Sequence, residues 1–269
     1  MQVKKFSWLF TLAIAFVVAM NIVVTACGGG SGTGTTSSPG ASAPQKLVMA
    51  TSADYPPYEY RDTAGGKNEI IGFDVDIANY IAKQLNYTLE IKDMDFNGLL
   101  PALQAKRVDF VMAGMTPTEE RKKSVEFTDV YFEAKNTIIA LKGSNLKKVE
   151  DLTGKGVGVQ LGSIQEGEMK KAAEKVQGIN LKSLNKIGDL IQEIKSKRLD
   201  AAIVEDTVAK GYIAANPDLE FNVIPSEGPS GSAIAFPKGS ALVKPFNEAL
   251  TQMKQKGEVE KLVKKWFEK

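Results

Sequence analysis

Short apolar runs alternate with helix-like patterns along most of the chain after residue 46. The runs at 47–50, 109–113 and 200–204 are short and largely apolar, which predicts buried strands. Residues 74–85 carry apolar side chains at three- and four-residue spacing, which predicts an amphipathic helix. Strands that alternate with helices in this way are typical of an α/β protein. The pattern also predicts one long helix over residues 245–267.

The run at 109–113 leads into a predicted helix start. Thr116 and Glu119 have the spacing of a capping box, and Pro117 falls at the first helical position, where its missing N–H costs nothing. The N–H groups of such a turn suit a carboxylate or phosphate. Arg121 then has two interpretations: it is a solvated arginine, or its guanidinium holds an anion together with these N–H groups.

A four-residue phrase nearly repeats in the chain, as KRVD at 106–109 and KRLD at 197–200. This repeat predicts two lobes of similar construction. A strand is predicted at 156–160, and Ser163 and Glu166 after it again have the spacing of a capping box. Each lobe is therefore expected to contain a strand whose end opens a helix.

Two acids, Glu205 and Asp206, follow the run at 200–204. Either they are a solvated pair in which Asp206 caps the next helix, or one carboxylate accepts an ammonium group. An ammonium acceptor here and an anion site at Arg121 would together fit a zwitterion. No nucleophile with its base is in view, so binding without chemistry is the simpler account.

Aromatic residues follow the first predicted strand, in a loop that contains Pro56 and Pro57. Open α/β sheets bind ligands at the carboxyl ends of their strands, so Tyr55 and Tyr58 are candidates to line a pocket. Tyr60 is expected to pack. Phe96 is either a core residue or a pocket wall.

Composition removes several classes of function. The chain has no histidine, and Cys27 is its only cysteine. These absences exclude Ser-His-Asp and Cys-His catalysis and the usual zinc sites, so we expect no metal and no cofactor. Removal of residues 1–27 would delete two of the 34 basic residues and none of the 32 acidic ones. The balanced remainder gives no indication of nucleic-acid binding.

The N-terminus has the pattern of an export signal. Lys4 and Lys5 precede an apolar run at 6–24, which is either a transmembrane anchor or a signal sequence. The sequence VTAC at 24–27 resembles the lipobox of bacterial lipoproteins. By that resemblance residues 1–27 are a lipoprotein signal peptide, and Cys27 becomes the acylated N-terminus at the outer face of the cytoplasmic membrane. Residues 28–45 are predicted to be a flexible tether.

Seven motifs occur in order between residues 46 and 269, namely TSADYPPYEY, GFDVDIA, DMDFNGLLPALQ, AGMTPTEER, FTDVYFEA, VGVQLGSIQE and DAAIVEDTVA. Together they resemble the family 3 solute-binding proteins, which are extracellular amino-acid receptors of ABC importers. Among subfamilies the sequence is most similar to the arginine-binding lipoproteins of Gram-positive bacteria.

The resemblance implies a two-lobed type II periplasmic-binding-protein fold, with a mixed sheet flanked by helices in each lobe and a ligand cleft between the lobes. Lobe 1 is expected to comprise residues 46–134 and 229–269, and lobe 2 residues 135–228. The crossing segments are expected near 134–136 and 227–231. The implied partners are the permease and ATPase subunits, and the implied oligomeric state is a monomer that closes about its hinge.

The resemblance also implies roles for individual residues. Arg121 would bind the ligand's α-carboxylate, and Tyr55 and Phe96 would sandwich its side chain. Glu205 would accept the ammonium, with Asp206 as the alternative. Many basic-amino-acid receptors carry an acid where this chain has Ser52, so another carboxylate is needed for a cationic side chain. The complete predicted set is Ser52, Asp54, Tyr55, Glu59, Phe96, Gly114, Met115, Thr116, Arg121, Gln160, Ser163, Ile164, Gln165 and Glu205.

The predicted ligand is L-arginine or another basic amino acid. A polar amino acid such as glutamine or cystine is the alternative within this class. An enzyme similar to cyclohexadienyl dehydratases, which share the fold, and a purely sensory or structural lipoprotein are the alternatives from other classes.

Overall fold

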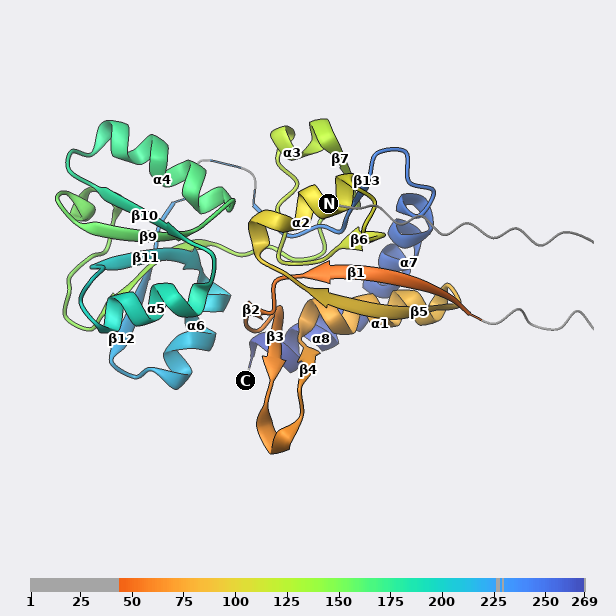
Figure 1. The fold of residues 1–269 in the computed structure, drawn as a ribbon. Helices are drawn as coiled ribbons and strands as arrows, with labels where there is room; N and C mark the ends of the chain where they lie inside the picture. Colours follow the sequence, from red (N-terminus) through yellow and green to blue (C-terminus); the bar gives the residue numbers. More distant parts are fainter. Residues whose placement is uncertain (1–43, 226–227, 229, 269) are drawn as a thin grey trace, which may run out of the picture. The chain divides into compact units, whose positions relative to one another are not determined.

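The computed structural model describes residues 44–225, 228 and 230–268 (Figure 1). The predicted signal peptide, Cys27 and residues 28–43 of the predicted tether lie outside the described residues. Gln45, which the sequence assigned to the tether, is instead the first residue of strand β1, because it pairs with Tyr87 in the neighbouring strand.

Two five-stranded sheets organise the fold. The first has the strand order β5 (Tyr87–Asp93), β1 (Gln45–Thr51), β6 (Phe110–Val111), β13 (Ala235–Pro237) and β7 (Val125–Phe127). The second has the order β10 (Asn180–Leu184), β9 (Gly156–Gln160), β11 (Ala201–Glu205), β8 (Asn136–Leu141) and β12 (Leu219–Val223). Both sheets are mixed, because β13 runs antiparallel to β6 and β8 runs antiparallel to β11.

A smaller sheet follows the end of β1. It consists of β2 (Asp54–Tyr55), β3 (Glu59–Asp62) and β4 (Glu69–Ile71), and its β3–β4 hairpin extends away from the first sheet (Figure 1). The short 3-10 helices η1 (Ala64–Gly66) and η2 (Val149–Leu152) lie in connections.

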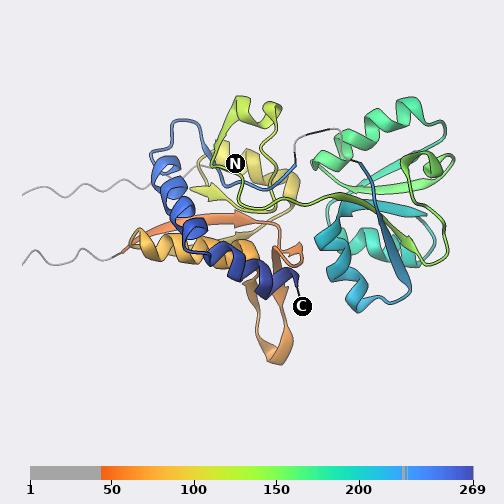
Figure 2. The same ribbon diagram turned by 180° about the vertical axis from the view of Figure 1, so that it is seen from behind.

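Helices cover both faces of the first sheet. One face carries α1 (Phe73–Gln84), α7 (Val243–Gln255) and α8 (Glu258–Phe267), and the other carries α2 (Phe96–Gln104) (Figures 1 and 2). The short α3 (Glu119–Ser124) precedes β7. The predicted apolar face of α1 is confirmed, since Ile77 and Ile81 are fully buried in one cluster with Phe246 of α7. Each such side chain stabilises the fold by roughly 1.5–3 kcal/mol.

Helices also cover both faces of the second sheet. The face that carries α5 (Ile187–Lys195) and α6 (Asp206–Ala215) buries Leu190 and Val208, and the face that carries α4 (Ile164–Lys175) buries Met169 against Val157 and Val159. The strands between them are apolar along most of their length because both of their faces are covered.

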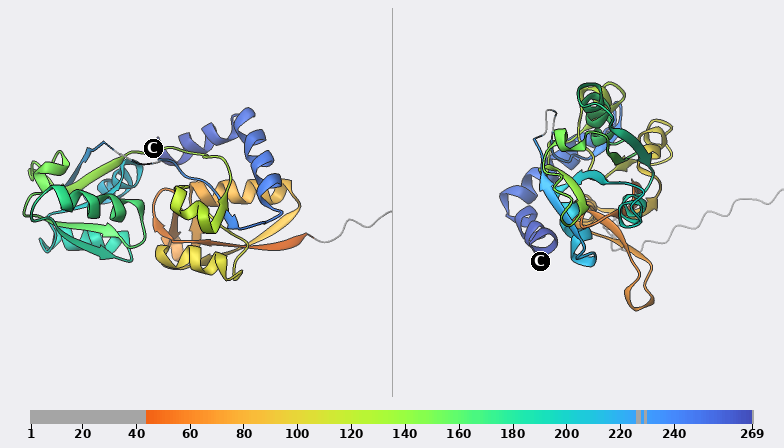
Figure 3. Two further views of the ribbon diagram at one scale, coloured as in Figure 1. Left: turned by 90° about the horizontal axis from the view of Figure 1, so that it is seen from above. Right: turned by 90° about the vertical axis from the view of Figure 1, so that its left-hand side faces the viewer.

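Two separate segments of the chain contribute strands to the first sheet. After β7 the chain builds the whole second sheet, from β8 to β12, and then returns for β13 (Figure 3). Residues 128–135, between β7 and β8, form the first connecting segment. It lies beside the returning chain, because Phe132 and Ser232 form an antiparallel bridge and the N–H of Tyr131 donates to the carbonyl of Ser232 (2.8 Å).

The predicted cap at Thr116 is wrong. Thr118 is the N-cap of α3, and its Oγ1 accepts a hydrogen bond from the N–H of Arg121 (3.2 Å). The carbonyl of Met115 accepts a hydrogen bond from the N–H of Ala233, beside β13 (2.9 Å). Because this bond holds the chain outside a helix at residue 115, α3 begins later than predicted. A contact between segments distant in sequence thus moves the helix start.

Two other predicted caps had different outcomes. Ser163 caps α4 as predicted, because its Oγ accepts from the N–H of Glu166 (3.1 Å). The Glu166 carboxylate, however, accepts from the N–H of Gly162 (2.7 Å). Asp206 is not a cap: it is the first residue of α6, and its Oδ1 accepts from the N–H of Lys135 (3.1 Å).

The single helix predicted over 245–267 is also wrong. Two helices, α7 and α8, meet at Gly257, which has a φ of 69°. That left-handed conformation ends a helix and is the one that glycine adopts without strain. The apolar pattern continues through the break because both helices pack on the same core.

Candidate functional site

A pocket lies between loops of the two sheets. It is lined by Tyr55, Phe96, Ala113, Gly114, Thr116, Arg121, Gln160, Ser163, Ile164, Gln165 and Glu205. These residues follow or end strands β1, β5, β6, β9 and β11, and the carboxyl ends of strands are where open α/β sheets bind ligands.

Arg121 supplies the positive charge of the pocket. Its Nη1 donates to the carbonyl of Thr116 (2.9 Å) and its Nη2 to the carbonyl of Gly162 (3.0 Å). Burial lowers the pKa of Arg121 to about 10, so the side chain is still cationic at neutral pH. Carbonyl groups orient the guanidinium but do not neutralise it, and no carboxylate among residues 44–225, 228 and 230–268 forms an ion pair with it. The arrangement suits an anion.

The first turn of α4 adds neutral hydrogen-bond donors to the pocket. Its cap, Ser163, and its first two residues, Ile164 and Gln165, all line the pocket. The N–H groups of a helix's first turn have no partner within the helix and lie at the positive end of its dipole. They can therefore share an anion with Arg121.

Glu205 supplies a buried acid at the end of β11. It is 5% exposed, and its Oε2 has no hydrogen-bond partner among the described residues. Burial raises the pKa of Glu205 to about 7, with smaller effects from Tyr58 and Asp206. A cationic group in the pocket would favour the ionised carboxylate. Of the two acids left open by the sequence, only Glu205 lines the pocket.

Aromatic and amide groups complete the pocket wall. Tyr55 and Phe96 are nearly buried, and the Phe96 ring centroid lies 5.5 Å from the guanidinium carbon of Arg121. Gln165 donates from Nε2 to Asn136 (2.9 Å), which leaves its amide oxygen as an acceptor.

Four predicted site residues lie outside the lining. Ser52 donates from its hydroxyl to Asp54 (2.7 Å), and the other oxygen of Asp54 accepts from the N–H of Ile187 at the start of α5 (2.7 Å). Glu59 is fully buried, and Met115 packs in the core on the α2 face of the first sheet. Asp54 and Glu59 were candidates to pair with a cationic ligand side chain, but their carboxyl groups lie behind the residues that line the pocket.

Sequence reasoning missed Ala113. A small apolar residue at the end of a buried run carries no chemical sign of a site. Its place directly before Gly114, which lines the same pocket, was the available indication.

Tyr58 and Tyr60 also have packing roles. Tyr58, a candidate pocket residue, is fully buried and stacks on Tyr55 with ring centroids 5.5 Å apart. Tyr60 packs edge-on against Trp266, as expected for a packing residue.

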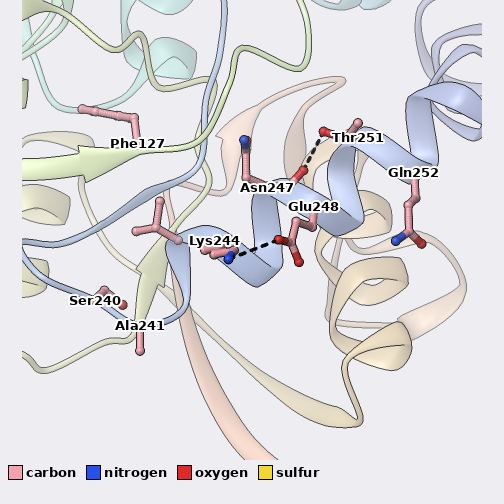
Figure 4. Close-up of a pocket in the computed structure, with 9 residues that line it drawn as sticks. Phe127, Ser240, Ala241, Lys244, Asn247, Glu248, Thr251 and Gln252 are labelled. Carbon is pink, nitrogen blue, oxygen red and sulfur yellow. Dashed lines mark hydrogen bonds and ion pairs between the residues drawn. The ribbon is translucent and has the colours of Figure 1, made fainter.

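A wider hollow lies along α7 (Figure 4). The charged side chains that line it, Lys244 and Glu248, are largely exposed and pair with each other (3.9 Å). No buried polar group of the kind found at Arg121 and Glu205 lines it. The hollow therefore gives no reason to place the functional site there.

Two negative findings apply to the part of the chain that the structure describes. None of its helices combines the length and apolar character needed to cross a membrane. It also contains no group of three or more histidine, cysteine, aspartate or glutamate side chains that could hold a metal ion.

The family model for the bacterial extracellular solute-binding proteins, family 3, matches residues 47–269. The chain belongs to this family. The family and its relatives are solute-binding proteins of transport systems, so this family 3 protein is not an enzyme.

One curated relative of this family 3 protein is the arginine-binding extracellular protein ArtP of Bacillus subtilis, which is 49% identical over 262 residues and covers 97% of each chain. A solved substrate-binding protein of an amino acid ABC transporter is 47% identical, with a TM-score of 0.79 over 83% of this chain and all of that one. An ancestral arginine-binding protein is 41% identical; its structure with arginine has a TM-score of 0.78 over 84% of this chain and 99% of that one. The structure of the same ancestral protein with glutamine has a TM-score of 0.77 and covers 83% of this chain and 98% of that one. These similarities confirm the predicted type II fold.

Proposed function

We propose that this family 3 protein is the extracellular receptor of an ABC importer, and that it captures L-arginine between two lobes and delivers it to permease and ATPase subunits. Lobe 1 comprises residues 46–134 and 229–269, and lobe 2 comprises residues 135–228. The two separate sheets, with one chain crossing in each direction, support this division. Of the predicted crossing segments, 134–136 is described, whereas residues 227 and 229 of the second lie outside the described residues.

One observation carries the proposal: the un-neutralised Arg121 and the buried carboxylate of Glu205 line the same small pocket. A cation and an anion in one enclosed site are complementary to the carboxylate and ammonium of an amino acid. Burial strengthens both interactions because the effective dielectric constant is lower than in water. No histidine, cysteine or lysine lines the pocket, so the described lining offers no nucleophile paired with a base.

Each lining group has a role in this proposal. Arg121 holds the α-carboxylate bidentately, with help from Thr116 and from the first turn of α4. Glu205 accepts the ammonium. Tyr55 and Phe96 sandwich the ligand's side chain, where a guanidinium gains cation–π attraction of roughly 0.5–2 kcal/mol.

Glutamine is the second candidate, and a specific observation favours it. Glu205 is the one carboxylate among the described residues that line the pocket, so once it pairs with the ammonium no second acid faces the ligand's side chain. The amides of Gln160 and Gln165 suit a neutral amide as well as a guanidinium. The ancestral relative was solved with both amino acids.

The decisive experiment is thermal unfolding of the full chain in detergent with each of the twenty amino acids, ornithine and citrulline. A ligand at a hundred times its Kd adds roughly 2.7 kcal/mol to the free energy of unfolding. A shift confined to arginine, or shared with lysine and ornithine, supports arginine capture. A shift with glutamine alone supports the second candidate, and no shift with any amino acid refutes the receptor proposal.

The membrane anchor is part of the proposal and needs its own test. The lipobox-like sequence before Cys27 supports acylation at that residue. A Cys27→Ser variant should leave the membrane fraction, while a control variant far from Cys27 in sequence, Ser240→Ala, should remain there. Equal membrane retention of both variants would contradict the lipoprotein assignment. We also propose a monomer, which sedimentation of the detergent-solubilised chain would check.

A further inference from the structure

Asp74, the second residue of α1, is fully buried behind the pocket. Its Oδ2 accepts two hydrogen bonds, one from the N–H of Gly114 (3.0 Å) and one from the hydroxyl of Tyr131 (2.7 Å). Gly114 lines the pocket, whereas Tyr131 lies in the first connecting segment. A single carboxylate oxygen thus joins the pocket to the chain that links the two sheets.

Glu59, in β3, is the acidic neighbour of Asp74. It is fully buried, and the two carboxyl groups are close enough for each to shift the pKa of the other. Neither oxygen of Glu59, nor Oδ1 of Asp74, has a hydrogen-bond partner among the described residues. A buried pair of neighbouring carboxyl groups avoids a second unbalanced charge when one of them is protonated, and the protonated group can then donate a hydrogen bond to the other. Burial, and then the charge of Asp74, raise the pKa of Glu59 well above its usual value, which favours the proton on Glu59.

We propose that Asp74, kept anionic by a proton on Glu59, is a positioning residue for ligand binding that fixes the Gly114 turn of the pocket against the first connecting segment. In this proposal the protonated Glu59 donates to Asp74 Oδ1, the oxygen without a partner among the described residues, while Oδ2 accepts from Gly114 and Tyr131. The effect on affinity rests on the proposed amino-acid binding. The effect on the Gly114 hydrogen bond does not.

The Gly114 turn depends on this acceptor for its geometry. Gly114 has a φ of 56°, and a Cβ there would lie 3.0 Å from Cε1 of Tyr55, so the turn is packed directly beneath that ring. Because a trans peptide points its N–H and C=O in opposite directions, the bond to Asp74 also fixes the direction of the Ala113 carbonyl. Without the acceptor, the buried N–H would lack a partner.

The surroundings explain why the pair retains one proton. The titratable groups that face it are Asp54, Glu205, Tyr58 and Tyr131. All of them are neutral or negative, and no lysine or arginine among the described residues contributes to the pKa of Glu59 or Asp74. A second negative charge would therefore be unbalanced in a buried site. Since the two groups are coupled, their titration belongs to the pair.

The test is an amide spectrum of the full chain in detergent, labelled with ¹³C-carbonyl alanine and ¹⁵N-glycine. The chain contains only two Ala-Gly steps, 64–65 and 113–114, so the exposed Gly65 is an internal control for Gly114. A bond to a carboxylate moves an amide proton downfield. Asp74→Asn should move the Gly114 signal upfield and leave Gly65 unchanged, whereas Glu59→Gln, whose amide can still donate to Asp74, should preserve it.

Calorimetry on the same proteins measures the consequence for arginine and glutamine binding at pH 7. Asp74→Asn should weaken binding about tenfold, because two charge-assisted bonds become neutral ones. Glu59→Gln should stay within about threefold, since it mimics the protonated acid. Asp76→Asn, on the same helix but paired with Lys265, is the matched control and should change neither readout.

Two results would overturn the proposal: a Gly114 signal that does not move in Asp74→Asn, or one that moves as far in Glu59→Gln. If Asp74→Asn does not fold, Tyr131→Phe removes only one donor to the same oxygen. It should then move the Gly114 signal further downfield, and an unmoved signal overturns the proposal. If neither the wild-type chain nor any variant binds an amino acid, the amide spectra still test whether Asp74 positions Gly114. The absence of binding then counts against the proposed function alone.

Discussion

Replacing Glu205 by glutamine tests whether the buried carboxylate accepts the ligand's ammonium group. In the ligand-free pocket, burial raises the pKa of Glu205 to about 7. An ammonium against the carboxylate favours ionisation and lowers that pKa. Ligand binding should therefore expel the proton that Glu205 carries, and the number of protons released should depend on pH.

The pKa of about 7 sets the size of the effect. At pH 6 about 90% of Glu205 is protonated, and at pH 8 about 10% is, so binding should release about 0.9 and about 0.1 protons. If the ligand-bound pKa lies below 6, the affinity should be about tenfold higher at pH 8 than at pH 6.

The same pKa predicts how the ligand-free protein responds to pH. A folded-state pKa above the unfolded value means that the folded protein binds the proton more tightly, so its stabilising effect is complete below about pH 4.5 and is lost as pH rises to about 7. The loss attributable to Glu205 is about 3 kcal/mol, from 1.36 kcal/mol per pKa unit. Bound ligand should restore much of this lost stability, because its ammonium group pairs with the Glu205 carboxylate.

Titration calorimetry in buffers of different ionisation enthalpy measures the released protons directly. Glu205→Gln should release none from this position, bind with equal affinity at pH 6 and pH 8, and lose about 1.5–3 kcal/mol of affinity at pH 8. Glu248→Gln, an exposed acid on α7, should behave as wild type. Other buried acids remain in both proteins, so the difference isolates Glu205. A variant that releases as many protons at pH 6 as wild type would refute the reasoning.

Three further predictions concern the pocket and its closure. Arg121→Lys keeps the charge but loses the bidentate fork, so calorimetry should show a loss of about 2 kcal/mol in affinity, whereas the exposed Arg107→Lys should show none. Gly114→Ala forces a left-handed alanine against the ring of Tyr55, and should cost about 1–2 kcal/mol and lower the Tm by roughly 2–8 °C in a calorimetric scan. Asp54→Asn weakens the hydrogen bond from the N–H of Ile187 at the start of α5. Small-angle scattering should then show a more open ligand-free form, and calorimetry should show about threefold weaker binding. Unchanged scattering and unchanged affinity would contradict this prediction.

Local features of the fold were predictable, and features that depend on tertiary pairing were not. The helix over 74–85 and the cap at Ser163 were found because periodicity and capping act within a few residues. The cap at Thr116 was misplaced because the Met115 carbonyl pairs with Ala233, which is distant in sequence. The break at Gly257 was missed because the apolar pattern does not stop there.

The candidate site, like the fold, has features that the sequence predicts and features that depend on tertiary packing. The sequence singled out Arg121 and the acid pair Glu205 and Asp206 from their places after strands, and the family resemblance favoured Glu205; the structure brings Arg121 and Glu205 to one pocket. It did not separate the lining from the layer behind it: Asp54 and Glu59 are acids in the same loop region as Tyr55, yet only the tyrosine lines the pocket. Burial of each side chain depends on which segment packs over it, and one chain's pattern does not show that.

By itself, the sequence determined the α/β alternation, the family resemblance and the exclusion of histidine- and cysteine-based chemistry, because these follow from residue type and local order. The tertiary structure alone decided which acid lines the pocket and which acids lie behind the lining. The N–H of Gly114 reaches Asp74, and Arg121 reaches the carbonyl of Gly162, only when separate segments fold together. Charge, protonation and specificity in the pocket depend on those long-range contacts, since each ionisable group responds to its neighbours in space.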